Sequence, residues 1–313
     1  MPMRTINREQ VLAKAGHVVL LMGGTSSERE ISLLSGQAVA SSLVSLGVHT
    51  TVIDVGENIV DELRSAAPDL VVNMLHGQGG EDGVIQGCLD LLQIPYTGSG
   101  VLASALAMDK VKSKQIWCQM GLATAPFTVL SEDSDWEEVI EGFERAVVKP
   151  IYGGSSLGVA IADSPGSLER AYREACEFRQ GVMAEKYIGG PEYSTGVLDD
   201  ELMPTILLET DREFFDFTAK YVDEGTRIVC PAPLSSERME AAEALVKSAY
   251  SALGCSGLAR VDFMGDAAGD FFLLEVNTVP GMTSHSFVPK SAARVGIDFD
   301  ELVLRILDRK LNG

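Results

Sequence analysis

The sequence predicts a doubly wound α/β domain at the N-terminus, followed by two α+β domains. Residues 18–22 form a continuous apolar run of strand length, and residues 31–46 carry apolar side chains at three- and four-residue spacings. Further strand-like runs at residues 50–54 and 70–75 alternate with helical segments, which is typical of a parallel sheet. The later strands and helices are shorter and less regular. We therefore expect domains at residues 1–100, 101–191 and 192–313.

The remaining elements follow from the same periodicities. Helices are expected at residues 60–66, 84–92, 101–120, 136–143, 168–178, 237–253 and 299–311, and one starts near Val288. Gly121 closes the helix at 101–120. Short apolar runs predict strands at residues 127–130, 146–149, 157–162 and 182–187, and two more at 259–263 and 271–277 form a hairpin.

Composition excludes several classes of protein. Among 313 residues, 46% are hydrophobic and 22% charged, as in an ordinary globular protein, and the net charge is −20. That charge argues against nucleic acid, whose binding depends on Lys and Arg. The five cysteines are scattered and predict reduced thiols. The apolar run at residues 18–22 is too short for the core of a signal peptide, and no apolar run approaches about 20 residues, so we expect a cytoplasmic protein without membrane insertion.

A glycine- and serine-rich loop is a candidate phosphate site. No Walker motif occurs, but Lys149 and Pro150 end a strand and lead into the loop 153–158. Glycines allow close backbone approach, successive N–H groups can bind an anion, and a lysine at the strand end could reach the same phosphates. A flexible hairpin loop is the alternative for such a run.

The hairpin near the C-terminus predicts a metal site. Side chains alternate along a strand, so Arg260 and Asp262 share one face, as do Glu275 and Asn277. If the turn closes symmetrically, both pairs lie on the same face of the hairpin. Two carboxylates and an amide oxygen suit Mg²⁺. The alternative is a solvated strand face whose charge Arg260 balances.

Three further loops could contribute to a site. The Pro-Gly corner at residues 278–286 could supply backbone N–H groups for an oxyanion, or it could be a simple turn. The segment 23–30 lacks a GxGxxG fingerprint and contains two possible capping boxes, Thr25 with Glu28 and Ser27 with Glu30. The loop that starts at His76 follows the third strand, where open α/β sheets bind ligands, although a lone histidine could be a scaffold residue.

These motifs occur in the order of the ATP-grasp superfamily, and the chain resembles the D-alanine–D-alanine ligase family within it. The resemblance runs from about Val18 to the C-terminal helix, with the first dozen or so residues as an unmatched extension. The matching stretches are residues 23–32, 76–83, 96–100, 108–110, 153–158, 185–186, 190–192, 219–221 and 275–282. Any one of them is weak, but the ordered set is highly specific.

The resemblance implies an ATP-grasp fold in which two antiparallel sheets hold ATP, with two Mg²⁺ ions (or Mn²⁺) as cofactors. It implies metal ligation by Asp262, Glu275 and Asn277. The implied ATP-binding residues are Lys110, Lys149, Ser156, Glu185, Lys186, Ile188, Glu192 and Lys220. Glu28 would hold the ammonium of the first D-alanine and be linked to Ser155 and Tyr221, with His76 nearby. Arg260 and Gly281 would form the oxyanion hole, and Ser286 would bind the second D-alanine. The resemblance also implies a homodimer.

The implied reaction joins two D-alanines through D-alanyl phosphate, for peptidoglycan precursors. Departures from the family are small: residues 151–153 are less polar than expected, and Tyr187 stands at a variable position. Residues 214–233 are the candidate lid. Related depsipeptide ligases carry a histidine where this chain has Tyr221, so a D-lactate ligase is the less favoured alternative, as is another ATP-grasp carboxylate-amine ligase. A regulatory protein without catalysis would lack Asp262, Glu275 or Arg260, and an NAD-dependent dehydrogenase would leave the C-terminal carboxylates unexplained.

Overall fold

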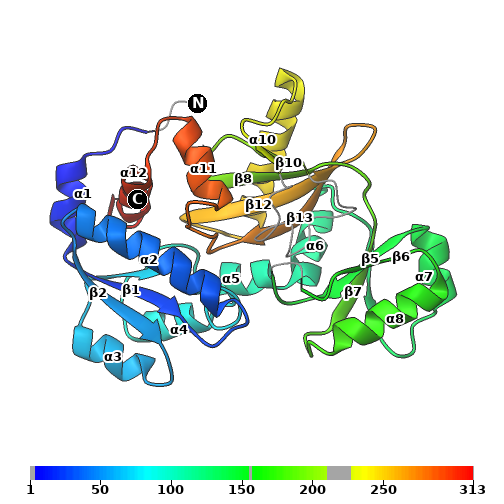
Figure 1. Cartoon of the computed structure of the whole chain (residues 1–313), viewed down its shortest axis with the longest axis horizontal. Helices are drawn as coiled ribbons and strands as arrows, with labels where there is room; N and C mark the ends of the chain where they lie inside the picture. The colour runs from blue at the N-terminus through cyan, green and yellow to red at the C-terminus, as the bar shows by residue number, and fades with distance from the viewer. Residues whose placement is uncertain (1–3, 155–156, 210–226, 313) are drawn as a thin grey trace.

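Three β-sheets succeed one another along the molecule, which is described here by a computed structural model (Figure 1). The structure describes residues 4–154, 157–209 and 227–312. The N-terminal sheet has the order β2-β1-β3 and is parallel throughout, as the alternating sequence predicts. Its strands are β1 (His17–Gly23), β2 (His49–Val55) and β3 (Leu70–Asn73), and the helices between and after them are α2 (Arg29–Ser45), α3 (Ile59–Ala66) and α4 (Val84–Leu91).

The helix expected at 101–120 is instead two helices, α5 (Val101–Met108) and α6 (Lys110–Gln119). Asp109 separates them because its backbone is extended, with φ −86° and ψ 99°, and its carboxylate accepts a hydrogen bond from the Lys112 amide at 2.9 Å. An Asp in this position caps a new helix and does not continue the old one. The prediction of one helix was therefore wrong, and the break places Lys110 at the start of α6.

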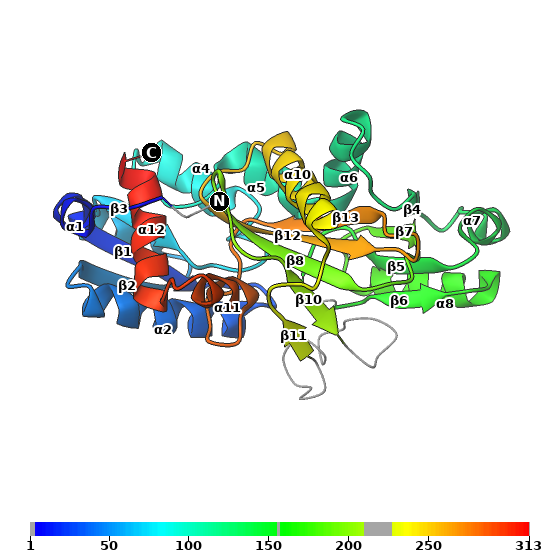
Figure 2. The same ribbon diagram turned by 90° about the horizontal axis from the view of Figure 1, so that it is seen from above.

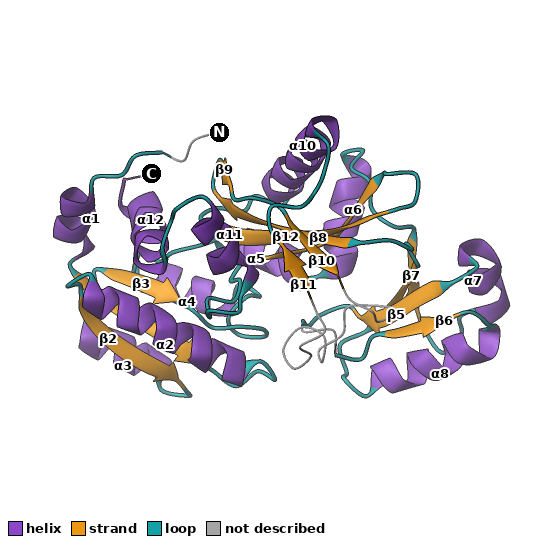
Figure 3. Ribbon diagram, turned by 45° about the horizontal axis from the view of Figure 1, so that its top comes forward, coloured by secondary structure: helices purple, strands orange, loops and turns teal. Residues whose placement is uncertain are grey.

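The second sheet is antiparallel, with the order β4-β7-β5-β6. Its strands are β4 (Phe127–Leu130), β5 (Ala146–Pro150), β6 (Ala160–Ala162) and β7 (Val182–Lys186). One face packs against α7 (Trp136–Phe143) and α8 (Pro165–Cys176), in a core that includes Val148, Ala184 and Leu168 (Figure 3). Alternation along β5 and β7 places Lys149 and Glu185 on the opposite face, away from these helices.

The third sheet has the order β11-β10-β8-β12-β13, with β9 paired to β8. Its strands are β8 (Glu192–Leu198), β9 (Glu201–Leu202), β10 (Ile206–Glu209), β11 (Arg227–Val229), β12 (Leu258–Gly265) and β13 (Phe271–Asn277). Tyr193, Val261 and Phe263 face a core shared with α10 (Ser236–Ala252). The alternate side chains, including Ser194 and Asp262, line the other face. Of the expected lid at residues 214–233, residues 214–226 lie outside the described residues.

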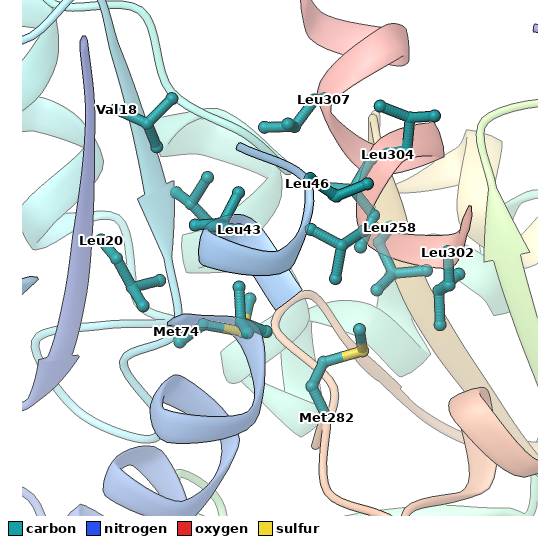
Figure 4. Close-up of a cluster of buried hydrophobic side chains, with 14 of the residues drawn as sticks. Val18, Leu20, Leu43, Leu46, Met74, Leu258, Met282, Leu302, Leu304 and Leu307 are labelled. Atoms are coloured by element: carbon teal, nitrogen blue, oxygen red, sulfur yellow. The ribbon is translucent and has the colours of Figure 1, made fainter. Parts of the chain in front are cut away.

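A shared hydrophobic core joins the first and third sheets. Val18 and Leu20 of β1 and Leu43 of α2 pack with Leu258 of β12 and with α12 (Phe299–Asn312), as Figure 4 shows. The N-terminal helix α1 (Arg8–Ala15) contributes Val11 and packs against α12, and α12 in turn contacts α11 (Phe287–Arg294) (Figure 2). The N-terminal extension is therefore part of the fold.

All five cysteines are free thiols, as predicted. None of the helices in the described part of the chain is long and apolar enough to cross a membrane.

Candidate active site

The β12–β13 hairpin carries four polar side chains on one face. Arg260 pairs with Asn277 across the strands, and Asp262 pairs with Glu275, so the sharing of a face expected from alternation is confirmed. Asp262 is only 2% exposed. A solvated strand face would leave this carboxylate in water, so that alternative is wrong.

Asp262 is held by three neighbours. Arg260 Nη2 donates to its Oδ2 at 2.7 Å and Arg260 Nε to its Oδ1 at 2.9 Å, while Asn277 Nδ2 donates to Oδ2 at 3.1 Å. Ser194 Oγ donates to Oδ1 at 2.6 Å from β8. The sequence analysis did not identify Ser194 as a site residue. The available signal was its position two residues after Glu192, because residues two apart on a strand lie on the same face.

Glu275, the second carboxylate of the hairpin, faces α6. Its Oε2 lies 3.2 Å from Nζ of Lys110, and Lys110 Nζ also donates to the Gly153 carbonyl at 2.5 Å. The break at Asp109 thus puts Lys110 between the glycine loop and the hairpin. Tyr152, one of the unexpected residues before the loop, donates to Asp109 Oδ2 at 2.9 Å and ties the loop to the same helix end.

The donor chemistry of the hairpin fits a magnesium ion. Asp262, Glu275 and Asn277 offer carboxylate and amide oxygens, which Mg²⁺ prefers. No group of three or more His, Cys, Asp or Glu side chains suited to a metal converges among residues 4–154, 157–209 and 227–312, because the third donor here is an amide. Arg260 and Lys110 neutralise the two carboxylates in this structure.

A second charged cluster lies on the face of the four-stranded sheet opposite α7 and α8, where α6 packs. Glu185 contacts Lys149 Nζ through Oε1 and Lys114 Nζ through Oε2, the latter at 2.8 Å. Burial alone would raise the pKa of Glu185, but the charges of Lys114 and Lys149 outweigh burial and lower it to about 2. Sequence reasoning missed Lys114, which is fully buried.

The other residues expected at the nucleotide lie nearby in the fold. Lys186 ends β7, where its amide donates to the Pro126 carbonyl at 2.8 Å, and Ile188 follows it and is half-buried. Glu192 opens β8 and pairs with Met264, on the same face as Asp262. Ser155, Ser156, Lys220 and Tyr221 fall outside the described residues, so their expected roles stay predictions.

Glu28 stands where three segments meet. A Cβ atom on Gly77 would lie 2.8 Å from its Oε2, and one on Gly154 would lie 2.9 Å from its Oε1. Glu28 occupies the N-cap position of α2, yet no side chain caps that helix end. The capping-box alternative was therefore wrong for residues 25–30, and the Glu28 carboxylate instead faces the glycine loop and the loop after β3.

His76 and Glu81 lie behind that junction. Burial, followed by the charge of Arg260, lowers the pKa of His76 to about 4, so it is neutral near pH 7. Desolvation, followed by the Glu28 carboxylate, raises the pKa of Glu81 to about 8. Glu81 accepts hydrogen bonds from the amides of Gly77 at 2.6 Å and Val279 at 3.3 Å. The sequence analysis identified the loop 76–83 as a candidate site segment but assigned no role to Glu81.

The Pro-Gly corner after β13 is anchored to the N-terminal unit. Ser35 of α2 accepts the Met282 amide at 3.1 Å and lies 3.3 Å from Nε2 of His76. A Cβ on Gly281 would lie 2.8 Å from Ser286 Oγ, and that hydroxyl accepts the Thr283 amide at 3.0 Å. Gly281 and Ser286, both predicted site residues, are therefore adjacent. Through the hydrogen bond from Met282 to Ser35, the Pro-Gly corner is held against α2.

Comparison with known proteins decides the family. The model of the D-ala D-ala ligase C-terminus matches residues 116–308, and that of the N-terminus matches residues 55–99. The chain belongs to the D-alanine–D-alanine ligase family. The ligase of Saccharophagus degradans is 46% identical over 300 residues, which cover 96% of each chain. That of Chromohalobacter salexigens is 48% identical over 294 residues, covering 94% of each.

A solved structure of a family member gives the same fold. The D-alanine–D-alanine ligase of Bacillus anthracis complexed with ATP superposes with a TM-score of 0.84 at 33% identity, covering 95% of this chain and 98% of that chain. The ATP-grasp fold expected from the sequence is therefore confirmed. Membership of this family also makes the NAD-dependent dehydrogenase alternative wrong.

Proposed function

We propose that this protein joins two D-alanine molecules at the expense of ATP, forming D-alanyl-D-alanine for peptidoglycan precursors. The observation that carries the proposal is the polar face of the hairpin, where Arg260, Asp262, Glu275 and Asn277 stand together opposite Lys110. The names of the relatives, which match over nearly the whole chain, support D-alanine as the substrate.

The first step transfers the γ-phosphoryl group. A carboxylate oxygen of the first D-alanine attacks the γ-phosphorus, the bond to the β-phosphate oxygen breaks, and ADP and D-alanyl phosphate form. Lys110 and Lys149 would neutralise charge on the phosphates, and Glu28 would hold the ammonium group of the substrate. Asp262, Glu275 and Asn277 would hold two Mg²⁺ ions, or Mn²⁺, whose chemistry is to neutralise phosphate charge.

The second step forms the peptide bond. The amine of the second D-alanine attacks the acyl carbon, and phosphate leaves from a tetrahedral intermediate. Arg260 and the Gly281 N–H would stabilise the oxyanion, and losing one such donor typically costs about 10²–10³ in rate. Ser286, beside Gly281, would bind the second carboxylate. Acyl phosphates hydrolyse readily, so water has to be excluded.

Other parts of the proposal come from the family. Tyr221 favours an amine over D-lactate as the second substrate, because a neutral phenol does not repel an ammonium group as a cationic histidine would. We also propose a homodimer, and a cytoplasmic location, where ATP is supplied.

A direct assay tests the function. We expect protein, Mg²⁺, ATP and D-alanine to release phosphate and D-alanyl-D-alanine in equal amounts, with L-alanine inactive in place of D-alanine. No D-alanine-dependent phosphate release would refute the proposal. More efficient incorporation of D-lactate than of D-alanine at neutral pH would instead favour the depsipeptide alternative.

A further inference from the structure

Lys114 is a buried cation with an unusual set of partners. It lies in α6 and is 0% exposed, and its Nζ is 2.8 Å from Oε2 of Glu185, which is 3% exposed. Lys149 contacts the other oxygen of Glu185. Lysines are almost never fully buried unless they are paired, because desolvation of the charge is costly. Packing alone therefore does not explain why Lys114, Lys149 and Glu185 are buried together.

The same ammonium group also connects two sheets. Lys114 Nζ donates to Thr124 Oγ1 at 2.5 Å and lies 3.4 Å from the Ala125 carbonyl. Thr124 Oγ1 in turn donates to the carbonyl of Leu273 in β13 at 2.8 Å. These contacts, together with the ion pair to Glu185, place the Lys114 ammonium group between β7 and β13.

We propose that Lys114 is a positioning residue that holds Glu185 as an ionised, acceptor-only carboxylate, so that the site selects a 6-amino purine over a 6-oxo purine. This inference rests on the proposed function and on the family resemblance, which implies that Glu185, Lys186 and Ile188 frame the adenine of ATP. Glu185 can accept a hydrogen bond from the 6-amino group of the base because a carboxylate has about four lone-pair positions, and its two lysine partners leave some of them available.

The chemistry of the two bases explains the selection. An ionised carboxylate can accept from a 6-amino group but cannot donate to a 6-oxo group. The charged groups that face Glu185 in the described part of the chain are Lys114 from α6 and Lys149 from β5, while Phe127 of β4 pairs with it as an apolar neighbour. Without Lys114, burial would raise the pKa of Glu185, and a protonated carboxyl group can donate to a 6-oxo group.

The test compares ATP with ITP, which differ at the 6-position of the purine. The variant is Lys114→Met, which keeps an unbranched chain, and it leaves Glu185 paired with Lys149. The control is Lys112→Met, the same substitution two residues away, where the lysine is exposed. We would measure kcat/KM for both nucleotides at pH 6 and pH 8, KM for D-alanine, and binding of ADP and IDP by calorimetry.

We expect Lys114→Met to lower the preference for ATP over ITP at least about tenfold, with a larger effect at pH 6 and an unchanged KM for D-alanine. In the wild type the ionised Glu185 cannot pair with the 6-oxo group of ITP, and an unpaired polar group in a site discriminates against a substrate. Protonation of Glu185 in Lys114→Met would remove that discrimination. A preference within twofold of the wild-type value would overturn the inference, whatever activity or stability is lost.

A second variant covers the case in which Lys114→Met does not fold. Glu185→Gln can both donate and accept, so it should relax the same preference in ADP and IDP binding, and an unchanged preference would overturn the inference. Failure of the proposed function gives a different result. A wild-type protein that prefers ADP to IDP but makes no dipeptide contradicts the function alone, whereas one that makes dipeptide equally well from ATP and ITP contradicts only the role of Lys114.

Discussion

Single side chains in the site differ in charge state from the same groups in water. The pKa of Glu81 is raised to about 8 by desolvation and then by Glu28. A carboxyl group whose pKa is higher in the folded protein contributes stability that is present below pH 4.5 and is lost as the pH rises through 8. The stability of the protein should therefore report on this residue.

Replacing Glu81 with glutamine should remove that pH dependence. The free energy of unfolding of the wild type minus that of Glu81→Gln should fall as the pH rises from about 4.5 to 8, by a few kcal/mol, since one pKa unit corresponds to about 1.4 kcal/mol. Urea unfolding of both proteins across this range measures the difference. A difference that stays constant with pH would show that the carboxyl group has an ordinary pKa.

Gly154 tests the position of Glu28. A Cβ at residue 154 would lie 2.9 Å from Oε1 of Glu28, so Gly154→Ala has to displace that carboxylate. A displacement of about 1 Å in a site can cost on the order of 10²-fold, so we expect kcat/KM for D-alanine to fall about 10- to 100-fold. Initial-rate kinetics at saturating ATP measure this change.

The matched control for Gly154→Ala is Gly142→Ala in α7, where a Cβ would meet no atom within 4 Å. Alanine is a better helix former than glycine, so Gly142→Ala should not destabilise α7, and the variant should keep its activity. If both alanine variants retain wild-type kinetics, Glu28 does not hold the substrate in the way we propose.

The β12–β13 hairpin works as one unit because its register aligns two cross-strand pairs. Asp262→Asn should weaken the magnesium site and remove the ion pair between residue 262 and Arg260. We expect kcat to fall on the order of 10²-fold or more, with a higher Mg²⁺ concentration at half-maximal rate, since a bound cation supplies several kcal/mol of charge stabilisation. A magnesium titration of the rate is the measurement.

Asp266→Asn is the control for this change, because it makes the same substitution in the turn of the same hairpin. Asp266 accepts the Asp270 amide at 2.8 Å and takes no part in the proposed site. Equal magnesium dependence in Asp262→Asn and Asp266→Asn would argue against metal binding by the hairpin.

Local sequence patterns predicted where helices and strands form. They predicted less well where a helix is interrupted, as at Asp109, and which polar side chains are buried. The alternation around Asp262 and Glu275 sufficed to predict one polar face, because strand geometry is periodic and the turn closes in register. The run KVKSK in α6 gave no sign that Lys114 is buried and Lys112 exposed. That difference comes from tertiary packing of α6 between two sheets. Glu81 was missed for the same reason, since its pKa depends on Glu28, which is distant in the sequence.

The molecule as a whole contains separate hydrophobic cores, and these predict how it unfolds. Leu304 of α12 lies in the core that joins the first and third sheets, whereas Leu168 of α8 lies in the core of the four-stranded sheet. Truncating a buried leucine to alanine costs roughly 2–5 kcal/mol. Leu304→Ala should speed hydrogen exchange in both β1 and β12, and Leu168→Ala should speed it in β5 and β7 without affecting β1.

Hydrogen exchange followed by mass spectrometry resolves these segments. Leu91→Ala is the control, because Leu91 is 89% exposed and should change no protection. Uniform loss of protection in both core variants would mean that the three sheets unfold as one cooperative unit.

The central claim is that a D-alanine carboxylate is activated by direct transfer of the γ-phosphoryl group. The most direct test uses D-alanine labelled with ¹⁸O in its carboxylate, with Mg²⁺ and ATP, and mass analysis of the released phosphate. Because a carboxylate oxygen attacks phosphorus and leaves with it, we predict one ¹⁸O atom in each phosphate released with the dipeptide. Phosphate free of ¹⁸O would contradict the account.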